Sequence, residues 1–177
     1  MIAAFSFFLT LLPEEGKCAN NSFLVPQNGV QFLTADSWLQ DGKLIRLYGV
    51  QSCLRGKTYT DQTGSSRDCG VVTATLLAAF VRDTKPLCRS VAGVAATKPG
   101  EEQTILVVCA ARIKNKTVDL GGLLITQGFA FAALANDGKP VYMPYYVQES
   151  VAQQSKRGMW AFDNVPHPSK ELLPRNR

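Results

Sequence analysis

The sequence predicts an α+β domain in which short strands enclose or abut three helices. Apolar runs of strand length occur in two pairs, and a strong turn signal joins the first pair. One segment with helical spacing separates the pairs, and two more follow the second pair. Periodicity alone therefore predicts a small domain with the order strands, helix, strands, helix, helix.

The first half of the chain supplies the first pair of strands and the first helix. Val30–Leu39 and Leu44–Val50 are strand-like runs, and residues 40–43 between them contain Asp-Gly, a strong hairpin signal. Gln51–Asp68 is a polar stretch rich in Gly, Thr and Ser and is expected to be a loop. Val71–Arg82 has apolar residues on one helical face, so it predicts the first helix.

The second half supplies two further strands and two helices. Leu87–Thr97 and Thr104–Ile113 are apolar, strand-like runs. Asp119 is a suitable N-cap for a helix over Leu120–Gln127, and Tyr145–Arg157 has the pattern of a third helix. A small five-stranded β-barrel of the OB type with three helices fits this order of elements.

The chain of 177 residues is long enough for one domain, expected over residues 20–165, with a polar tail over 166–177. Residues 1–19 contain the uncharged apolar run Ile2–Leu12, which suits a signal peptide and is short for a membrane span. A buried N-terminal helix or strand is the alternative. We favour export, and expect the processed protein not to be an integral membrane protein.

The cysteines agree with export. If Cys18 leaves with the signal peptide, four cysteines remain, and these allow three connectivities. Cys53 and Cys69 flank one polar loop, while Cys88 and Cys109 lie on neighbouring apolar segments, so we predict the pairs 53–69 and 88–109. Two disulfides indicate an oxidising compartment, so the predicted location is periplasmic or secreted; four buried thiols in a cytosolic protein are the alternative.

The formal net charge is +5, which favours an anionic partner such as nucleic acid, an acidic polysaccharide or a lipid surface. The chain has a single histidine and no C-x-x-C motif, which argues against a zinc site.

Arg46 is the unusual residue of the second strand, because it interrupts the apolar run Leu44–Val50. A guanidinium is never neutral and is costly to bury alone, so Arg46 needs an anionic partner. The simpler hypothesis is a structural salt bridge. The alternative is a phosphate-binding arginine at the end of a barrel strand.

Six short motifs then occur in a fixed order along the chain. They are TADSWL at Thr34–Leu39, IRLYGV at Ile45–Val50, Cys69-Gly70 followed by an Ala/Leu-rich helix, Cys88 and Cys109 on two strands, DLGGLLITQGFA at Asp119–Ala130, and Glu149, Ala152, Gly158, Met159 and Trp160 near the end. In this order they resemble the motifs D-G-D-T-L, I-R-L-x-G-I-D-A-P-E, C-G-x-x-A-x-x-x-L, D-x-Y-G-R-x-V-A-x-C, D-L-N-x-x-L-V-x-x-G-x-A and E-x-x-A-x-x-x-x-x-G-L-W of the staphylococcal-nuclease (thermonuclease) family. The resemblance runs from about Val30 to Trp160 and implies an OB-type barrel of the exported bacterial branch.

The resemblance also implies a chemistry. In that family carboxylates hold Ca²⁺, a glutamate acts as general base, and two arginines bind the phosphate of DNA or RNA and stabilise the transition state. Arg46 matches the first arginine, and Asp36 matches one calcium carboxylate.

The other family positions differ in this chain. Thr34 stands where the partner aspartate of Asp36 is expected. On a gapless alignment Gln51 replaces a calcium ligand and Leu54 replaces the general base; alternatively D-A-P-E is deleted and residues 51–53 match a later Q-x-C. Thr104 stands in place of the second arginine. The loop acids that could compensate are Asp61, Asp68, Glu101 and Glu102.

The sequence therefore predicts a binding or assembly module on a nuclease-like barrel, without a cofactor and inactive as a nuclease. Its predicted partners are nucleic acid, another anionic polymer or a protein partner. Candidate contacts are Arg46, Arg112, Tyr142 and Tyr146, whereas Tyr145 is expected to pack at the start of its helix. One alternative is a residual calcium-dependent phosphodiesterase built on Arg46 and Asp36; another is a structural envelope protein.

Overall fold

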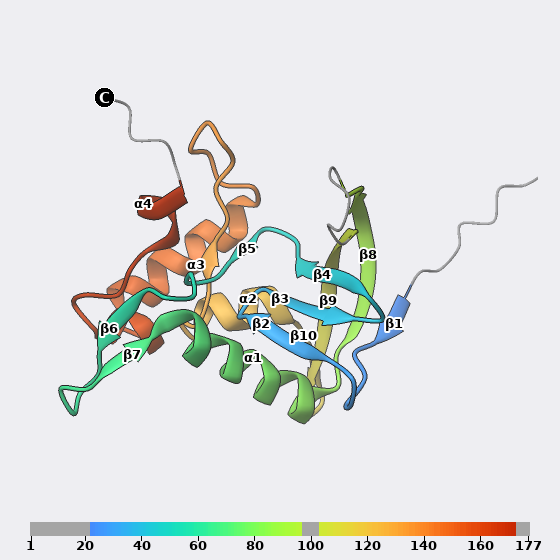
Figure 1. Ribbon diagram of the computed structural model, residues 1–177, viewed down its shortest axis with the longest axis horizontal. Helices are drawn as coiled ribbons and strands as arrows, with labels where there is room; N and C mark the ends of the chain where they lie inside the picture. Colours follow the sequence, from blue (N-terminus) through green and yellow to red (C-terminus); the bar gives the residue numbers. More distant parts are fainter. Residues whose placement is uncertain (1–21, 97–102, 173–177) are drawn as a thin grey trace, which may run out of the picture.

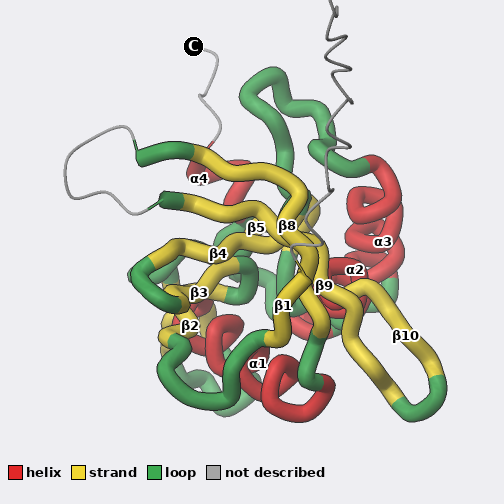
Figure 2. Tube along the Cα trace, turned by 90° about the vertical axis from the view of Figure 1, so that its right-hand side faces the viewer, coloured by secondary structure: helices red, strands yellow, loops and turns green. Residues whose placement is uncertain are grey.

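The computed structural model describes residues 22–96 and 103–172, and these form an α+β fold around a curled mixed sheet (Figure 1). The N-terminal segment expected to be a signal peptide lies outside the described residues, as do Cys18, Glu101 and Glu102. Figure 2 shows the sheet curling around a core that helices close from one side.

The main sheet has seven strands, of which six follow one another from edge to edge and the seventh branches from the third. In spatial order they are β1 (Ser22–Leu24), β8 (Leu87–Val94), β9 (Thr104–Ile113), β4 (Lys43–Leu47), β3 (Ser37–Gln40) and β2 (Gln31–Thr34), with β10 (Lys116–Asp119) paired to β9. All neighbours are antiparallel except β4 and β9, which run parallel with Arg46 opposite Leu106. The sheet exceeds the expected five strands because β1 and β10 extend it.

Two small ribbons accompany the main sheet. β5 (Val50–Gln51) pairs with β11 (Phe131–Ala132), and β6 (Thr58–Thr60) pairs with β7 (Ser66–Asp68). The last two strands lie inside the segment Gln51–Asp68 that was expected to be a loop.

The Asp-Gly hairpin is confirmed, since Asp41 and Gly42 take positive φ angles of 51° and 68° between β3 and β4. The prediction of one strand over Val30–Leu39 is wrong. The chain turns at Ala35 and Asp36, and the two halves of the run pair with each other as β2 and β3. Side chains of the turn bind one another, which stabilises this reversal within an otherwise strand-like sequence.

The three predicted helices are present as α1 (Cys69–Thr84), α2 (Leu120–Thr126) and α3 (Met143–Gln154). Asp119 caps α2 as expected, and α3 begins two residues early because Pro144 suits a first helical turn. A 3₁₀ turn at Gly158–Ala161 and the short α4 (Pro168–Leu172) follow. In Figures 1 and 2, α1 lies beside β2 while α2 and α3 lie together at the other end of the sheet.

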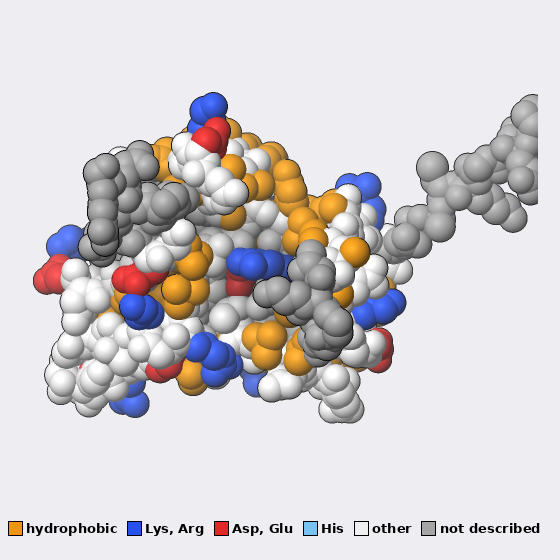
Figure 3. Space-filling view, turned by 45° about the horizontal axis from the view of Figure 1, so that its top comes forward, with side chains coloured by type: hydrophobic (Ala, Val, Ile, Leu, Met, Phe, Trp, Pro, Cys, Tyr) orange, Lys and Arg blue, Asp and Glu red, His pale blue; other side chains and the backbone are white. Residues whose placement is uncertain are grey.

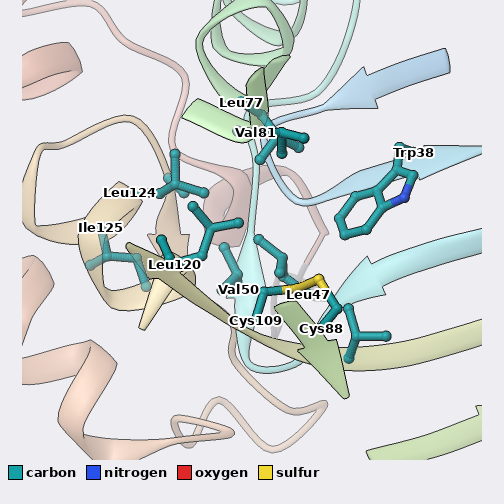
Figure 4. Packing of buried hydrophobic residues seen from close by; sticks show 14 of the residues in the cluster. Trp38, Leu47, Val50, Leu77, Val81, Cys88, Cys109, Leu120, Leu124 and Ile125 are labelled. Atoms are coloured by element: carbon teal, nitrogen blue, oxygen red, sulfur yellow. A yellow bond between two sulfur atoms is a disulfide. The ribbon is translucent and has the colours of Figure 1, made fainter. Parts of the chain in front are cut away.

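The main core lies between the inner face of the sheet and helices α1 and α2, with Trp38 and Leu77 fully buried (Figure 4). Both predicted disulfides are confirmed. Cys88 and Cys109 face each other across β8 and β9, with their Cα atoms 4.0 Å apart, and this bridge belongs to the main core.

The second bridge, Cys53–Cys69, ties the chain after β5 to the start of α1 and lies in a smaller core cluster. Trp160 and Phe162 pack against this cluster. The segment expected as a polar tail also contributes here, because Pro168 at the start of α4 is buried and Lys57 forms an ion pair with Glu171. Among the described residues, every helix is too short or too polar to span a bilayer.

Candidate functional site

Arg46 and Asp36 form an ion pair at the outer face of β4. Nε of Arg46 donates to Oδ2 of Asp36 at 3.0 Å, and Nη2 lies 2.9 Å from the same oxygen within the ion pair. The register of the β3–β4 hairpin places Ser37 opposite Arg46, so the turn residue before Ser37 lies beside the guanidinium. The hypothesis of a structural salt bridge therefore describes what Arg46 does in the fold.

The carboxylate of Asp36 is fully engaged. Its other oxygen, Oδ1, accepts a hydrogen bond from Thr34 at 2.5 Å, and the Thr34 hydroxyl in turn lies 2.6 Å from that of Ser37. Asp36 is only 2% exposed. A calcium ion needs several accessible oxygen ligands, and Asp36 does not offer one in this arrangement.

Gln51 is the second side chain that binds Arg46. Its Oε1 accepts from Nη2 of Arg46 at 3.0 Å. On the gapless alignment that the resemblance allows, this amide would stand in place of a metal carboxylate. Nη1 of Arg46 makes no hydrogen bond within the described part of the chain, and the side chain is 38% exposed. One edge of the guanidinium is anchored, and the other remains available to a ligand.

The loop acids that could compensate have structural roles elsewhere. Asp61 binds Thr63 and Arg67 within the β6–β7 hairpin; the hydrogen bonds from Thr63 and then Arg67 lower the pKa of its carboxyl. Asp68 caps α1 through the backbone N–H of Val71. Across residues 22–96 and 103–172 no three or more His, Cys, Asp and Glu side chains gather as metal ligands would.

Thr104 and Leu54, at the other two positions where the resemblance implies a charged residue, bring no charge. Thr104 begins β9, one pleat before Leu106, which is opposite Arg46. Leu54 follows the disulfide residue Cys53 and is half-buried. The catalytic set that the resemblance implies is thus represented by Arg46 and Asp36 alone.

A groove of about 610 Å³ lies between the start of α3 and the outer face of the sheet. Tyr48 enters it from the end of β4, two residues after Arg46 and on the same face, since Leu47 between them is buried. Its lining residues are Tyr48, Val91, Ala92, Val108, Asp119, Tyr142, Pro144, Tyr145 and Gln148. Three tyrosines and one carboxylate therefore meet in a groove that begins two residues beyond Arg46 along the chain.

Tyr145 fixes the wall of this groove and is buried, as its expected packing role requires. Its hydroxyl donates to Asp119 Oδ2 at 2.5 Å, and its ring contacts that of Tyr142 edge-on at 4.8 Å. Burial, and then the hydrogen bond to and charge of Asp119, raise the pKa of Tyr145. Gly49 lets α3 approach: its φ is +73°, and a Cβ there would lie 3.3 Å from both tyrosine side chains.

Two arginines extend the surface beyond the groove. A second hollow of about 370 Å³ shares Val108 and Asp119 with the groove and is lined by Arg89. Arg112 lies further along β9 on the same outer face as Val108, because alternate residues of a strand share a face. Arg46, Tyr48, Tyr142, Arg89 and Arg112 thus belong to one side of the sheet, which we call the outer sheet face.

Tyr146 is separated from the other candidate contacts. It lines a different hollow of about 520 Å³ on the other side of α3, together with Trp160 and Lys156. The tyrosines predicted to act together, Tyr142 and Tyr146, therefore line two different hollows, with Tyr142 at the N-cap of α3 and Tyr146 within the helix.

That hollow contains a chain of polar side chains that the sequence did not predict. Glu149 Oε1 lies 2.7 Å from His167 Nε2, and His167 Nδ1 lies 2.5 Å from the Ser169 hydroxyl. The backbone N–H of Ser169 donates to Nδ1, so the ring proton resides on Nε2 and is donated to the buried Glu149. In the sequence, the single histidine and a glutamate within a predicted helix are the features that could have indicated this chain of hydrogen bonds.

The face drawn in Figure 3 is hollowed near its centre, where basic and acidic side chains meet beside a run of hydrophobic ones. Comparison with protein-family models gives no match for this chain. A search among curated proteins likewise finds no significant relative.

Proposed function

We propose that this protein is an exported, non-catalytic binding module that holds a linear anionic polymer on its outer sheet face. The observation that carries the proposal is a contrast between Arg46 on β4 and Tyr48 just beyond its end. The carboxylate of Asp36, which pairs with Arg46, is buried and hydrogen-bonded within the β2–β3 turn. The aromatic groove that Tyr48 lines is open.

The fold supports this proposal. We assign the curled strands β2, β3, β4, β9 and β8 to an OB-type barrel of the staphylococcal-nuclease kind, which has five strands and is partly open. OB barrels bind oligonucleotides and oligosaccharides on the face of their second and third strands. In this chain those strands are β3 and β4, and β4 carries Arg46 with Tyr48 just beyond it.

Export is supported by the disulfides. Cross-links of this kind form and persist in oxidising compartments, and both bridges lie inside buried clusters. We therefore propose a periplasmic or secreted location.

The charge and the side chains of the outer sheet face support a polymer ligand. Arg89 and Arg112 make no ion pair within the described residues, and Arg46 keeps Nη1 available. Arginines that alternate with aromatic rings hold a charged backbone while the rings contact the units that it carries. A polymer lying across β4, β9 and β8 would meet both kinds of group.

Binding without cleavage is the test. The protein is incubated with labelled single-stranded DNA and, separately, with a labelled polyuronate, at rising salt concentration. We expect salt-sensitive retention of at least one polymer, weakened in Arg89→Ala and Arg112→Ala and unchanged in Arg82→Ala, whose arginine lies on α1. Absence of retention of either polymer at low salt would refute the proposal.

A residual calcium-dependent phosphodiesterase is the second candidate, and the position of Arg46 favours it. Its guanidinium still presents Nη1 beside the groove, as a phosphate-binding arginine would. Without a metal carboxylate, a general base or a second arginine, the expected rate is lower by at least about 10²–10⁴ for the missing base alone. Cleavage that requires calcium and Arg46 would decide for this candidate.

A further inference from the structure

The groove beside Arg46 has a chemistry that selects one kind of polymer. Two acceptors of its lining lack a partner. Asp119 Oδ2 already accepts from Tyr145 and from the backbone of Gly122, but Oδ1 makes no hydrogen bond within the described part of the chain. Gln148 Oε1 is shielded from water and has no hydrogen-bond partner among the described residues. A molecule with several hydrogen-bond donors would supply the partners that these two oxygens lack.

Among the residues that the structure describes, no cationic side chain lines the groove itself. The negative charge of Asp119 disfavours a phosphate or carboxylate inside it, whereas Arg89 in the adjoining hollow and Arg46, two residues before Tyr48, can bind anionic groups outside it. The groove thus suits an uncharged unit of a polymer whose neighbouring units are anionic. Its volume of about 610 Å³ falls within the range of about 300–1,000 Å³ of small-ligand sites.

The apolar part of the lining completes the description of this unit. Tyr48 and Tyr142 are 37% and 46% exposed and present ring surface, while Val108 and Pro144 add aliphatic surface. A sugar ring has C–H faces for such surfaces and hydroxyls that rotate to donate to whichever acceptor is near. A nucleobase offers only the few N–H donors of one fixed edge, whereas a sugar can turn several hydroxyls toward both acceptors.

We infer that the groove binds a neutral sugar unit of an acidic polysaccharide, with its hydroxyls on Asp119 and Gln148 and its ring against Tyr48 and Tyr142. The inference rests on the proposed function, because it names the polymer that the outer sheet face holds. The Gln148 amide takes part by turning about its terminal torsion, which is broad and roughly two-fold in such side chains.

The test uses two tyrosines, the N-cap residue Tyr142 and the α3 residue Tyr146, which line different hollows. Tyr142 and Tyr146 are 46% and 47% exposed, so replacing either by alanine removes similar exposed ring surface. The full chain is titrated calorimetrically with a hexasaccharide that alternates a uronic acid with a neutral N-acetylhexosamine, and with a six-nucleotide strand of thymidylate. We expect Tyr142→Ala to raise the Kd for the hexasaccharide about tenfold and Tyr146→Ala to leave it within about twofold.

Asp119→Asn is the second variant, because asparagine still caps a helix but lacks the carboxylate charge. It should also weaken hexasaccharide binding, with the fold verified by circular dichroism. If Tyr142→Ala and Tyr146→Ala changed the Kd for the hexasaccharide equally, the inference would be overturned. The proposed function would still stand if polymer binding depended on Arg89. Thymidylate binding that depends on Tyr142, without hexasaccharide binding, would overturn the choice of sugar. Failure to bind either probe, or the longer polymers, would refute the proposed function as well.

Discussion

Arg46 donates a hydrogen bond from Nε to Oδ2 of Asp36 and places Nη2 2.9 Å from the same oxygen, while the other oxygen of Asp36 accepts from Thr34. The pair lies at the junction of the β2–β3 turn and strand β4, where Leu47 N–H also donates to the Asp36 carbonyl. Asp36 thus joins two strands through both its backbone and its side chain. The ion pair therefore has a structural role and holds the β2–β3 turn against β4, although its two residue types also occur in phosphate and metal sites.

The structural role of the Asp36–Arg46 ion pair predicts the effect of Asp36→Asn on stability. The substitution keeps the side-chain volume but leaves Arg46 without its anion, so the free energy of unfolding should fall by about 1–2 kcal/mol, less than for a fully buried pair because Arg46 is partly exposed. Urea unfolding measures the change. Asp41→Asn in the exposed β3–β4 turn is the matched control and should cost less than about 0.5 kcal/mol. Equal stability of the two variants would contradict the structural role of Asp36.

The chain from Glu149 to Ser169 predicts a second stability effect. His167→Ala removes the partner of a buried carboxylate oxygen, and an unsatisfied buried acceptor costs about 1–3 kcal/mol. His167→Gln can still donate to Glu149, so it should recover part of the loss. Thermal unfolding of both variants checks the order. If alanine and glutamine were equally well tolerated, the C-terminal segment would not depend on this bond.

The Cys88–Cys109 bridge closes a loop between residues 21 positions apart. Its replacement by two alanines should lower the free energy of unfolding by about 3 kcal/mol, because the unfolded chain regains loop freedom. Urea denaturation under oxidising conditions measures this loss. The native fold should persist, because the β8–β9 pairing extends well beyond the bridge. An unchanged urea midpoint would show that the bridge contributes little.

Tyr145 predicts a dependence of stability on alkaline pH. Its pKa in the folded protein is raised above the ordinary value of 10.0, so the neutral phenol favours the folded state. The corresponding stability is complete below about pH 10 and is lost as pH rises toward the folded pKa, because only the unfolded chain releases the proton in that window.

Tyr145→Phe should therefore be less stable than the parent at pH 8, by about 1 kcal/mol for the lost hydrogen bond to Asp119. Between pH 10 and 11 its stability should decline less steeply than that of the parent. Urea unfolding at both ends of this range measures the two slopes. Parallel curves would mean that Tyr145 ionises as readily in the folded protein as in the unfolded chain.

The local features of the fold could be predicted from the sequence because each depends on neighbouring residues. Asp41-Gly42 forms its hairpin and Asp119 caps its helix, as these residue types do in most contexts. The division of Val30–Leu39 into two strands was missed, since Asp36 turns the chain only with the help of Thr34 and Ser37.

The site was less predictable because it depends on register and on helix packing. That Asp36 would meet Arg46 follows from the pairing of Ser37 with Arg46, which no local pattern fixes. Tyr48 and Tyr142 line one groove only because α3 packs against Gly49. Tyr142 and Tyr146 line different hollows, and Tyr142 precedes the helix in an extended conformation. His167 was assigned to a polar tail, yet it binds Glu149 from the far side of α3.

The central claim is that the protein holds an anionic polymer without cutting it, and one assay tests both halves. The protein is incubated with end-labelled single-stranded DNA and with a labelled polyuronate in the presence of calcium, and retention and polymer length are measured on the same samples. We predict retention of at least one polymer at low salt, with both polymers at full length. Calcium-dependent shortening of the DNA that disappears in Arg46→Ala would contradict the claim.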